Sequence, residues 1–149
     1  MIYEDGEKRY IRNRLMGIVD KAIHIEDPLY TDHMAKEAEL FQHALHPTWI
    51  YEERFMPDKG WDFLLLNGKK IDCKWSKEHS NNLITPKGYV FKSDYYTFVT
   101  GPSKDDLVER GWATRAEFIS APVVNLGRGT YSYIVYQRYL HPMSEFPNE

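Results

Sequence analysis

The segment Trp61–Trp75 has the sequence WDFLLLNGKKIDCKW and predicts the core of the fold. Two apolar runs flank Asn67-Gly68, a pattern typical of two strands joined as a β-hairpin. Side chains alternate between the faces of a strand, and apolar residues here occupy both faces. Such a hairpin belongs in the middle of a covered sheet. Charged groups in that place need partners or a metal ion, because burial penalises an isolated charge.

The length of the hairpin loop determines whether Asp62 and Asp72 share a face. A two-residue type I′ loop pairs Asp62 with Cys73 and points the two aspartates to opposite faces. A three-residue loop, with Gly68 left-handed and a bulge, pairs Asp62 with Asp72 instead. Paired residues have Cβ atoms about 4.5–5.5 Å apart, close enough for two carboxylates to hold one divalent ion. We expect this second geometry, with Lys74 on the same side.

The pattern resembles the PD-(D/E)XK nuclease superfamily, in which an acidic residue precedes a hairpin and an Asp/Glu-x-Lys strand. Asp62 and Asp72-Cys73-Lys74 match that pattern. Asp58 is a competing first carboxylate, but it lies four residues, or about 13 Å of extended strand, before Asp62. The resemblance covers residues 31–100 well, and Ser93–Val99 is similar to a later core strand of the family. The helix that the family usually places before that strand has little room in residues 76–88.

The resemblance implies a restriction-endonuclease-like (Holliday-resolvase-like) fold of the α/β or α+β class, with a mixed central β-sheet flanked by helices. It also implies a Mg²⁺ site, with Mn²⁺ as a substitute, held by Asp62, Asp72 and the Cys73 carbonyl. Lys74 would orient the attacking water or stabilise the transition state. A glutamate from the preceding helix completes such sites, and Glu37 and Glu39 compete for that role. Glu37 shares its helix face with Leu40, Phe41 and Ala44, so we choose Glu37 and expect Glu39 to face solvent.

The rest of the chain carries further element signals. Apolar periodicity predicts a helix over Tyr10–Ile23, and a second helix opens at Thr31 or Asp32 and runs to about Leu45. We expect strands over Thr48–Phe55, Tyr89–Lys92, Tyr95–Thr100 and Tyr131–Leu140, and a polar loop over Ser76–Lys87. The sequences Ser103–Asp106 and Thr114–Glu117 are capping boxes that each begin a short helix.

Composition limits the class of protein. The chain has 149 residues, 42% of them hydrophobic, which fits one domain over residues 1–149. A single cysteine excludes an internal disulfide, and the charged N-terminal sequence has no secretory apolar stretch, so we expect a cytoplasmic protein without a membrane partner. The net charge of −3 is unusual for a protein that binds DNA non-specifically.

These observations leave more than one function open. The first is a Mg²⁺-dependent DNA endonuclease, acting alone or as a homodimer, with DNA preferred over RNA. Lys70, Lys77, Lys87 and Lys92 would contact the phosphates of the nucleic acid. The alternative is a non-catalytic nucleic-acid-binding or assembly module in which Asp62, Asp72 and Lys74 form ion pairs on a sheet.

Overall fold

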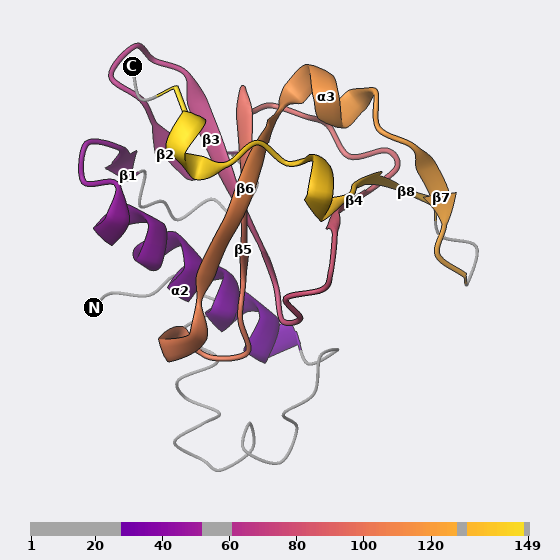
Figure 1. Ribbon diagram of the computed structural model, residues 1–149, viewed down its shortest axis with the longest axis horizontal. Coiled ribbons are helices and arrows are strands. Elements are labelled where there is room, and N and C mark those ends of the chain that lie inside the picture. Colours follow the sequence, from indigo (N-terminus) through magenta and orange to yellow (C-terminus); the bar gives the residue numbers. More distant parts are fainter. Residues whose placement is uncertain (1–27, 52–60, 128–130, 148–149) are drawn as a thin grey trace.

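The computed structural model describes residues 28–51, 61–127 and 131–147, and within them the protein is a mixed α+β structure (Figure 1). The α-helices are α2 (Pro28–Leu45) and α3 (Arg115–Ile119). The strands are β1 (Ile50–Tyr51), β2 (Phe63–Leu64), β3 (Lys70–Ser76), β4 (Leu83–Pro86), β5 (Tyr95–Thr100), β6 (Val108–Thr114), β7 (Val123–Asn125) and β8 (Tyr131–Val135). Three 3₁₀ turns are η2 (Lys104–Asp106), η3 (Gln137–Tyr139) and η4 (Met143–Glu145).

A mixed five-stranded sheet forms the centre of the molecule. Its strand order is β1-β2-β3-β5-β6, in which β3 and β5 are parallel and the other neighbours are antiparallel. Parallel neighbours need a long crossover, because a hairpin turn reverses the chain. That crossover, residues 77–94, carries β4, which pairs with β8 in a second sheet of order β4-β8-β7. Within this crossover the regular element is therefore a strand.

The hairpin between β2 and β3 has the three-residue loop. The ladder pairs Phe63 with Ile71 and Leu64 with Lys70, and the amide of Leu65 donates to the carbonyl of Lys69 at 2.8 Å. Gly68 has a φ of 86°, the left-handed conformation that glycine adopts at little cost. The three-residue loop predicted from sequence is confirmed, and the ladder that it sets extends to the pair Phe63–Ile71, one residue from Asp62 and Asp72.

Helix α2 covers one face of the central sheet, while the smaller sheet and α3 lie beyond the other (Figure 1). On the α2 side, Tyr30, Met34 and Ala38 pack against Val99 and Leu107. These helix residues recur every four positions and therefore form one stripe. On the opposite side, a second cluster joins the sheet to β4, β8 and α3; its buried members are Leu83, Tyr96, Phe98, Ala113, Phe118 and Val135.

Several sequence-predicted elements are confirmed. Strand β5 has the predicted bounds, and α2 ends at the predicted residue but begins earlier, with Pro28. At the start of α3, Thr114 accepts from the amide of Glu117, whose carboxylate accepts from the amide of Thr114, so the capping box is formed. The Ser103 box starts only a 3₁₀ turn without a side-chain cap. The helix expected over residues 10–23 lies outside the described residues.

Other predictions were wrong. Residues 89–92 are not a strand, the loop predicted for residues 76–87 contains β4, and β8 ends at Val135 instead of residue 140. Strands β6 and β7 were not predicted. Gly111 interrupts the apolar pattern of β6, where a Cβ atom would lie 2.6 Å from the carbonyl oxygen of His141. Only glycine permits that approach.

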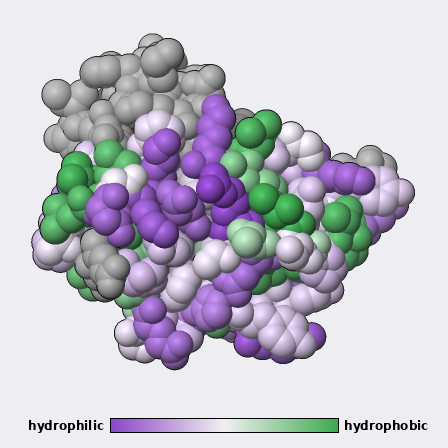
Figure 2. Space-filling view, turned by 90° about the horizontal axis from the view of Figure 1, so that it is seen from above, coloured by the Kyte–Doolittle hydropathy of each residue, from purple (hydrophilic) through white to green (hydrophobic). Residues whose placement is uncertain are grey.

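The surface mixes polar and apolar side chains. Seen from above Figure 1, hydrophilic residues occupy the centre of the surface and hydrophobic residues lie on both sides (Figure 2). No described helix combines the length and the apolar character needed to cross a membrane.

Candidate metal centre

The candidate site begins on β3, where Asp72 and Lys74 project to the same face because they are two residues apart. The Nζ atom of Lys74 lies 3.0 Å from Oδ2 of Asp72. The hydroxyl of Tyr89 donates to the same oxygen at 3.2 Å, and the Lys74 ammonium lies 4.6 Å from the centroid of the Tyr89 ring. Tyr89 thus holds both members of the ion pair.

Asp62 reaches the same place from the start of the hairpin. Its amide donates to the carbonyl of Ile71 at 2.7 Å, although Ile71 is the ladder partner of Phe63. Two consecutive residues therefore oppose one residue of β3, as in a β-bulge, which re-aims the side chain. Oδ2 of Asp62 accepts a hydrogen bond from the amide of Cys73 at 2.8 Å. This bond holds the Asp62 carboxyl group against the backbone of β3.

The helix glutamate whose charge acts on Asp62 is Glu39, and the expectation that Glu39 faces solvent was wrong. Glu39 is only 9% exposed, and its charge acts directly on Asp62. It pairs with Lys36, 3.4 Å away, and accepts from the Tyr51 hydroxyl at 3.2 Å. Glu37 instead forms an i,i+4 contact with His33, at 3.6 Å.

The error has a physical cause in the packing of α2. We assigned the core-facing side from Leu40, Phe41 and Ala44, but Leu40 is only partly buried and Ala44 is exposed. The sheet contacts small Ala38 and polar Gln42 instead, both fully buried. Glu39 follows Ala38 and so lies at the margin of the buried stripe, where it can approach Asp62.

Burial and like charges act on this cluster together. Asp62 and Asp72 are 5% and 8% exposed. Burial raises the pKa of Asp62 well above its usual range, and the carboxylates of Glu39 and Asp72 raise it further. A hydrogen bond between the carboxyl groups of Asp62 and Asp72 acts in the same direction. Clustered carboxyl groups with shifted pKa values are typical of functional sites.

The cations and phenols nearby respond to the same charges. Burial alone would lower the pKa of Lys74, but the carboxylate of Asp72 outweighs it and the pKa is raised. Burial and Asp72 raise the pKa of Tyr89 to about 12. Lys74 is therefore a cation at neutral pH, and Tyr89 is a neutral donor. Burial also raises the pKa of Cys73, which makes its thiol a poor nucleophile.

The oxygen atoms of this cluster are of the kind that a hard divalent cation prefers, but the side chains do not converge on one position. Glu39, Asp62 and Asp72 offer carboxylate oxygens, and the backbone of Cys73 adds a carbonyl between Asp72 and Lys74. Within residues 28–51, 61–127 and 131–147, no three His, Cys, Asp or Glu side chains are arranged to hold a metal ion. In this conformation Lys74 and Tyr89 occupy Oδ2 of Asp72, and the Cys73 amide occupies Oδ2 of Asp62.

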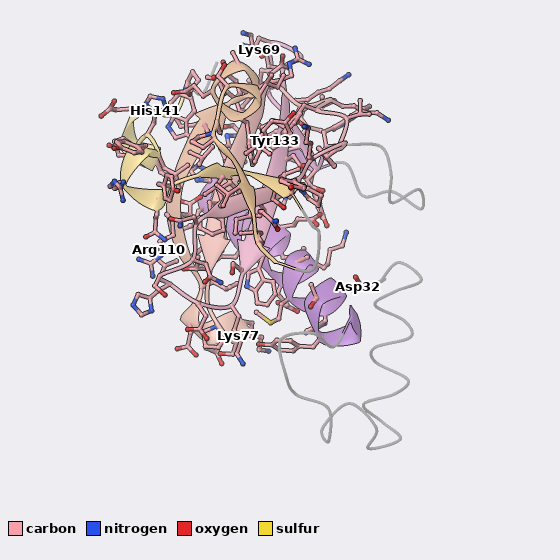
Figure 3. All side chains as sticks on the ribbon, turned by 90° about the vertical axis from the view of Figure 1, so that its right-hand side faces the viewer. Asp32, Lys69, Lys77, Arg110, Tyr133 and His141 are labelled. Atoms are coloured by element: carbon pink, nitrogen blue, oxygen red, sulfur yellow. The ribbon has the colours of Figure 1, made fainter. Side chains whose placement is uncertain are left out.

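The four predicted phosphate-contacting lysines lie in different places. Lys70 shares the face of Asp72, and its Nζ lies 4.1 Å from the centroid of the Trp61 ring. Lys87 and Lys92 are exposed and flank Tyr89 in the sequence. Lys77 follows the far end of β3, at the opposite end of the molecule from Lys69 (Figure 3). The structure therefore does not unite them as one rim.

Tyr89 was not recognised from sequence, where Tyr89–Lys92 had the signals of a strand. Its contact with Asp72 depends on the conformation of the crossover, which no local pattern encodes.

Comparison of the chain with models of known protein families, with curated proteins and with solved structures finds no match.

Proposed function

We propose that this protein is a metal-dependent nuclease of the PD-(D/E)XK type that hydrolyses phosphodiester bonds, with DNA as the preferred substrate. The observation that carries the proposal is the group of three buried carboxyl groups, Glu39, Asp62 and Asp72, beside the ammonium of Lys74. Holding acids together in this way is unfavourable for folding, and a divalent cation would compensate for it.

In this proposal, Asp62, Asp72 and the Cys73 carbonyl would hold Mg²⁺ or Mn²⁺, and Glu39, on α2, would hold a water molecule bound to that ion or a second ion. The bound ion would lower the pKa of a water molecule and polarise the phosphate. Lys74 contributes a permanent positive charge, because Asp72 keeps its pKa high. That charge can orient the water or stabilise the phosphate as negative charge develops on it.

The side chains around Asp72 set the conditions for binding. Lys74 and Tyr89 both contact Oδ2 of Asp72, which is one of the oxygens that the cation would require. If Asp72 turned toward a bound cation, its contact with Lys74 would break, and the Lys74 ammonium would become available to a substrate phosphate. The ion pair with Asp72 thus keeps the Lys74 ammonium close to the position where it would act.

A non-catalytic module is the second candidate, and a specific observation favours it. Lys74 and Lys36 already pair with Asp72 and Glu39. These contacts are what an ion-paired structural cluster on a nucleic-acid-binding or assembly module would contain.

A cleavage assay separates the two candidates. The full chain is incubated with single-stranded DNA, double-stranded DNA and RNA in Mg²⁺, Mn²⁺, Ca²⁺ or EDTA. The nuclease predicts cleavage with Mg²⁺ or Mn²⁺ and none with EDTA. It also predicts none with Ca²⁺, which is larger and holds its ligands less rigidly. Binding without cleavage under every condition would favour the module.

A further inference from the structure

A polar pocket lies away from the acidic cluster, at the ends of the parallel strands β3 and β5. It has a volume of about 510 Å³, and its lining includes Lys77, Glu78, His79, Thr100, Asp106 and Arg110. The amide of Gly101 donates to the carbonyl of Ser76 at 3.1 Å, which ties the ends of β3 and β5 together. Ligands of α/β proteins commonly bind beyond the carboxyl ends of parallel strands.

Arg110 is positioned to bind a phosphate. Its Nε donates to the Thr100 hydroxyl at 2.8 Å, and Thr100 is fully buried. This bond fixes the plane of the guanidinium group. Within the described part of the chain, its two terminal nitrogens have no hydrogen bond or ion pair. A guanidinium group held in this way can form two parallel hydrogen bonds to a phosphate.

Lys77 and His79 add further donors from the segment that follows β3. Lys77 forms no ion pair with any described residue, and Figure 3 shows it and Arg110 at the same end of the molecule. The backbone at His79 is held in place, because its carbonyl accepts from the side-chain amide of Gln137 at 2.7 Å. Donors from two separate segments of the chain therefore meet in one pocket.

The pocket also contains two acids, Glu78 and Asp106, whose negative charges balance the positive charges of Lys77 and Arg110. Asp106 accepts from the Ser103 hydroxyl at 2.6 Å. A simple anion would gain little electrostatic attraction in a pocket whose positive and negative charges balance. A nucleotide matches it better, because its phosphate accepts hydrogen bonds and the amino group of cytosine donates to a carboxylate. The volume is also within the range of small-ligand pockets.

We propose that this pocket, which we call the strand-end pocket, binds one unpaired nucleotide of a nucleic-acid strand. The phosphate contacts Arg110 and Lys77, and the base contacts Glu78 or Asp106. The pocket begins after Ser76, about 13 Å along β3 from Asp72, so the nucleotide would be separate from the one that reacts. The identity of the ligand as nucleic acid rests on the proposed nuclease function.

The test measures binding of a labelled short oligodeoxycytidylate by fluorescence anisotropy, in EDTA, with the full chain. We expect Arg110→Gln and Lys77→Gln each to weaken binding about tenfold, the loss of one charge-assisted contact. Matched controls are Arg138→Gln and Lys104→Gln, which remove exposed cations outside the lining and should leave affinity unchanged. Glu78→Ala combined with Asp106→Ala should abolish a preference for oligodeoxycytidylate over oligothymidylate, because alanine cannot accept from the cytosine amino group and thymine has no such group.

Equal affinities of the parent, Arg110→Gln and Lys77→Gln would overturn the strand-end pocket, as would absence of binding by the parent. Lys77 is partly exposed at the start of the connection that follows β3 and forms no ion pair with any described residue, so its variant keeps the test valid if Arg110→Gln does not fold. If the parent cleaves DNA in Mg²⁺ and the pocket variants bind the oligonucleotide as tightly as the parent does, the strand-end pocket is wrong and the nuclease function is retained. If Arg110→Gln weakens binding and the parent never cleaves DNA, the strand-end pocket is retained and the nuclease function is wrong.

Discussion

Lys74 Nζ lies 3.0 Å from Oδ2 of Asp72, two residues earlier on the same face of β3. Both side chains are largely buried, and Tyr89 donates to the same oxygen. The acid and the lysine of the Asp72-Cys73-Lys74 sequence therefore form an ion pair. This contact links the two candidate functions, because it is a structural ion pair in one and a resting state in the other.

Glu39 and Glu37 provide a matched comparison on one helix. Under the proposed function, Glu39→Gln should weaken Mn²⁺ binding and cleavage by about tenfold or more, because it removes a carboxylate next to Asp62. Glu37→Gln should change neither, since Glu37 contacts His33 instead. Calorimetric titration and a cleavage assay on both variants measure the difference. An effect of Glu37→Gln with none of Glu39→Gln would show that the helix contribution is misassigned.

Asp62→Asn should stabilise the protein in EDTA at neutral and higher pH. The pKa of Asp62 is raised by burial, Glu39 and Asp72, so the folded state binds more protons than the unfolded chain, where the usual value is 3.8. The stability of the parent therefore falls as pH rises from about 4 through the raised pKa. Asparagine has no such titration, and its oxygen can still accept from the Cys73 amide.

Thermal unfolding at pH 5 and pH 8 tests this linkage. We expect Asp62→Asn to raise Tm by a few degrees at pH 8, with a smaller gain at pH 5. Asp105→Asn, at an exposed position of η2, is the control and should shift Tm little at either pH. A larger gain at the lower pH would contradict the sign of the shift.

Tyr89→Phe tests whether the hydroxyl restrains Asp72. Loss of the 3.2 Å hydrogen bond should reduce the free energy of unfolding by about 1 kcal/mol. Affinity for Mn²⁺ should stay the same or increase, because the contacted oxygen becomes more available. Tyr131→Phe removes an exposed hydroxyl and is the matched control. Markedly weaker Mn²⁺ binding by Tyr89→Phe alone would mean that the hydroxyl supports the site instead.

Gly68→Ala tests the loop that sets the register. The residue has a positive φ, and a Cβ atom added there would meet no other atom within 4 Å, so only backbone strain opposes alanine. We expect a loss of about 1 kcal/mol in the free energy of unfolding, with the site retained. Chemical denaturation measures the loss. An unchanged stability would show that the loop does not require the left-handed conformation.

The hairpin shows what the sequence could predict. The number of residues in the loop, the position of Gly68 and the alternation along β3 are local properties, and together they predict that Asp62, Asp72 and Lys74 lie close together. The bulge at Asp62 was not predicted. Strand β5 and the Thr114 capping box were predictable for the same reason, since each depends on neighbouring residues.

The remaining features depend on tertiary packing. The phase of α2 was misread because Ala38 and Gln42 contact the sheet where larger apolar residues were expected. Tyr89 reaches Asp72 through an irregular crossover, and β4 is a four-residue strand ending in Pro86 whose partner, β8, is remote in sequence. Such contacts leave little signal in the local pattern.

The most direct test of the nuclease account is calorimetric titration of Mg²⁺ or Mn²⁺ into the parent, Asp72→Asn and Lys74→Ala, together with a cleavage assay. Asp72→Asn should lose metal binding and cleavage, and it should lower the free energy of unfolding by about 1–3 kcal/mol because the half-buried Lys74 loses its charged partner. Lys74→Ala should still bind metal and should lose turnover, since lysine is not a ligand. The account predicts this separation of binding from turnover. Undiminished cleavage by Asp72→Asn, or no metal binding by the parent, would contradict it and leave the ion-paired module as the function.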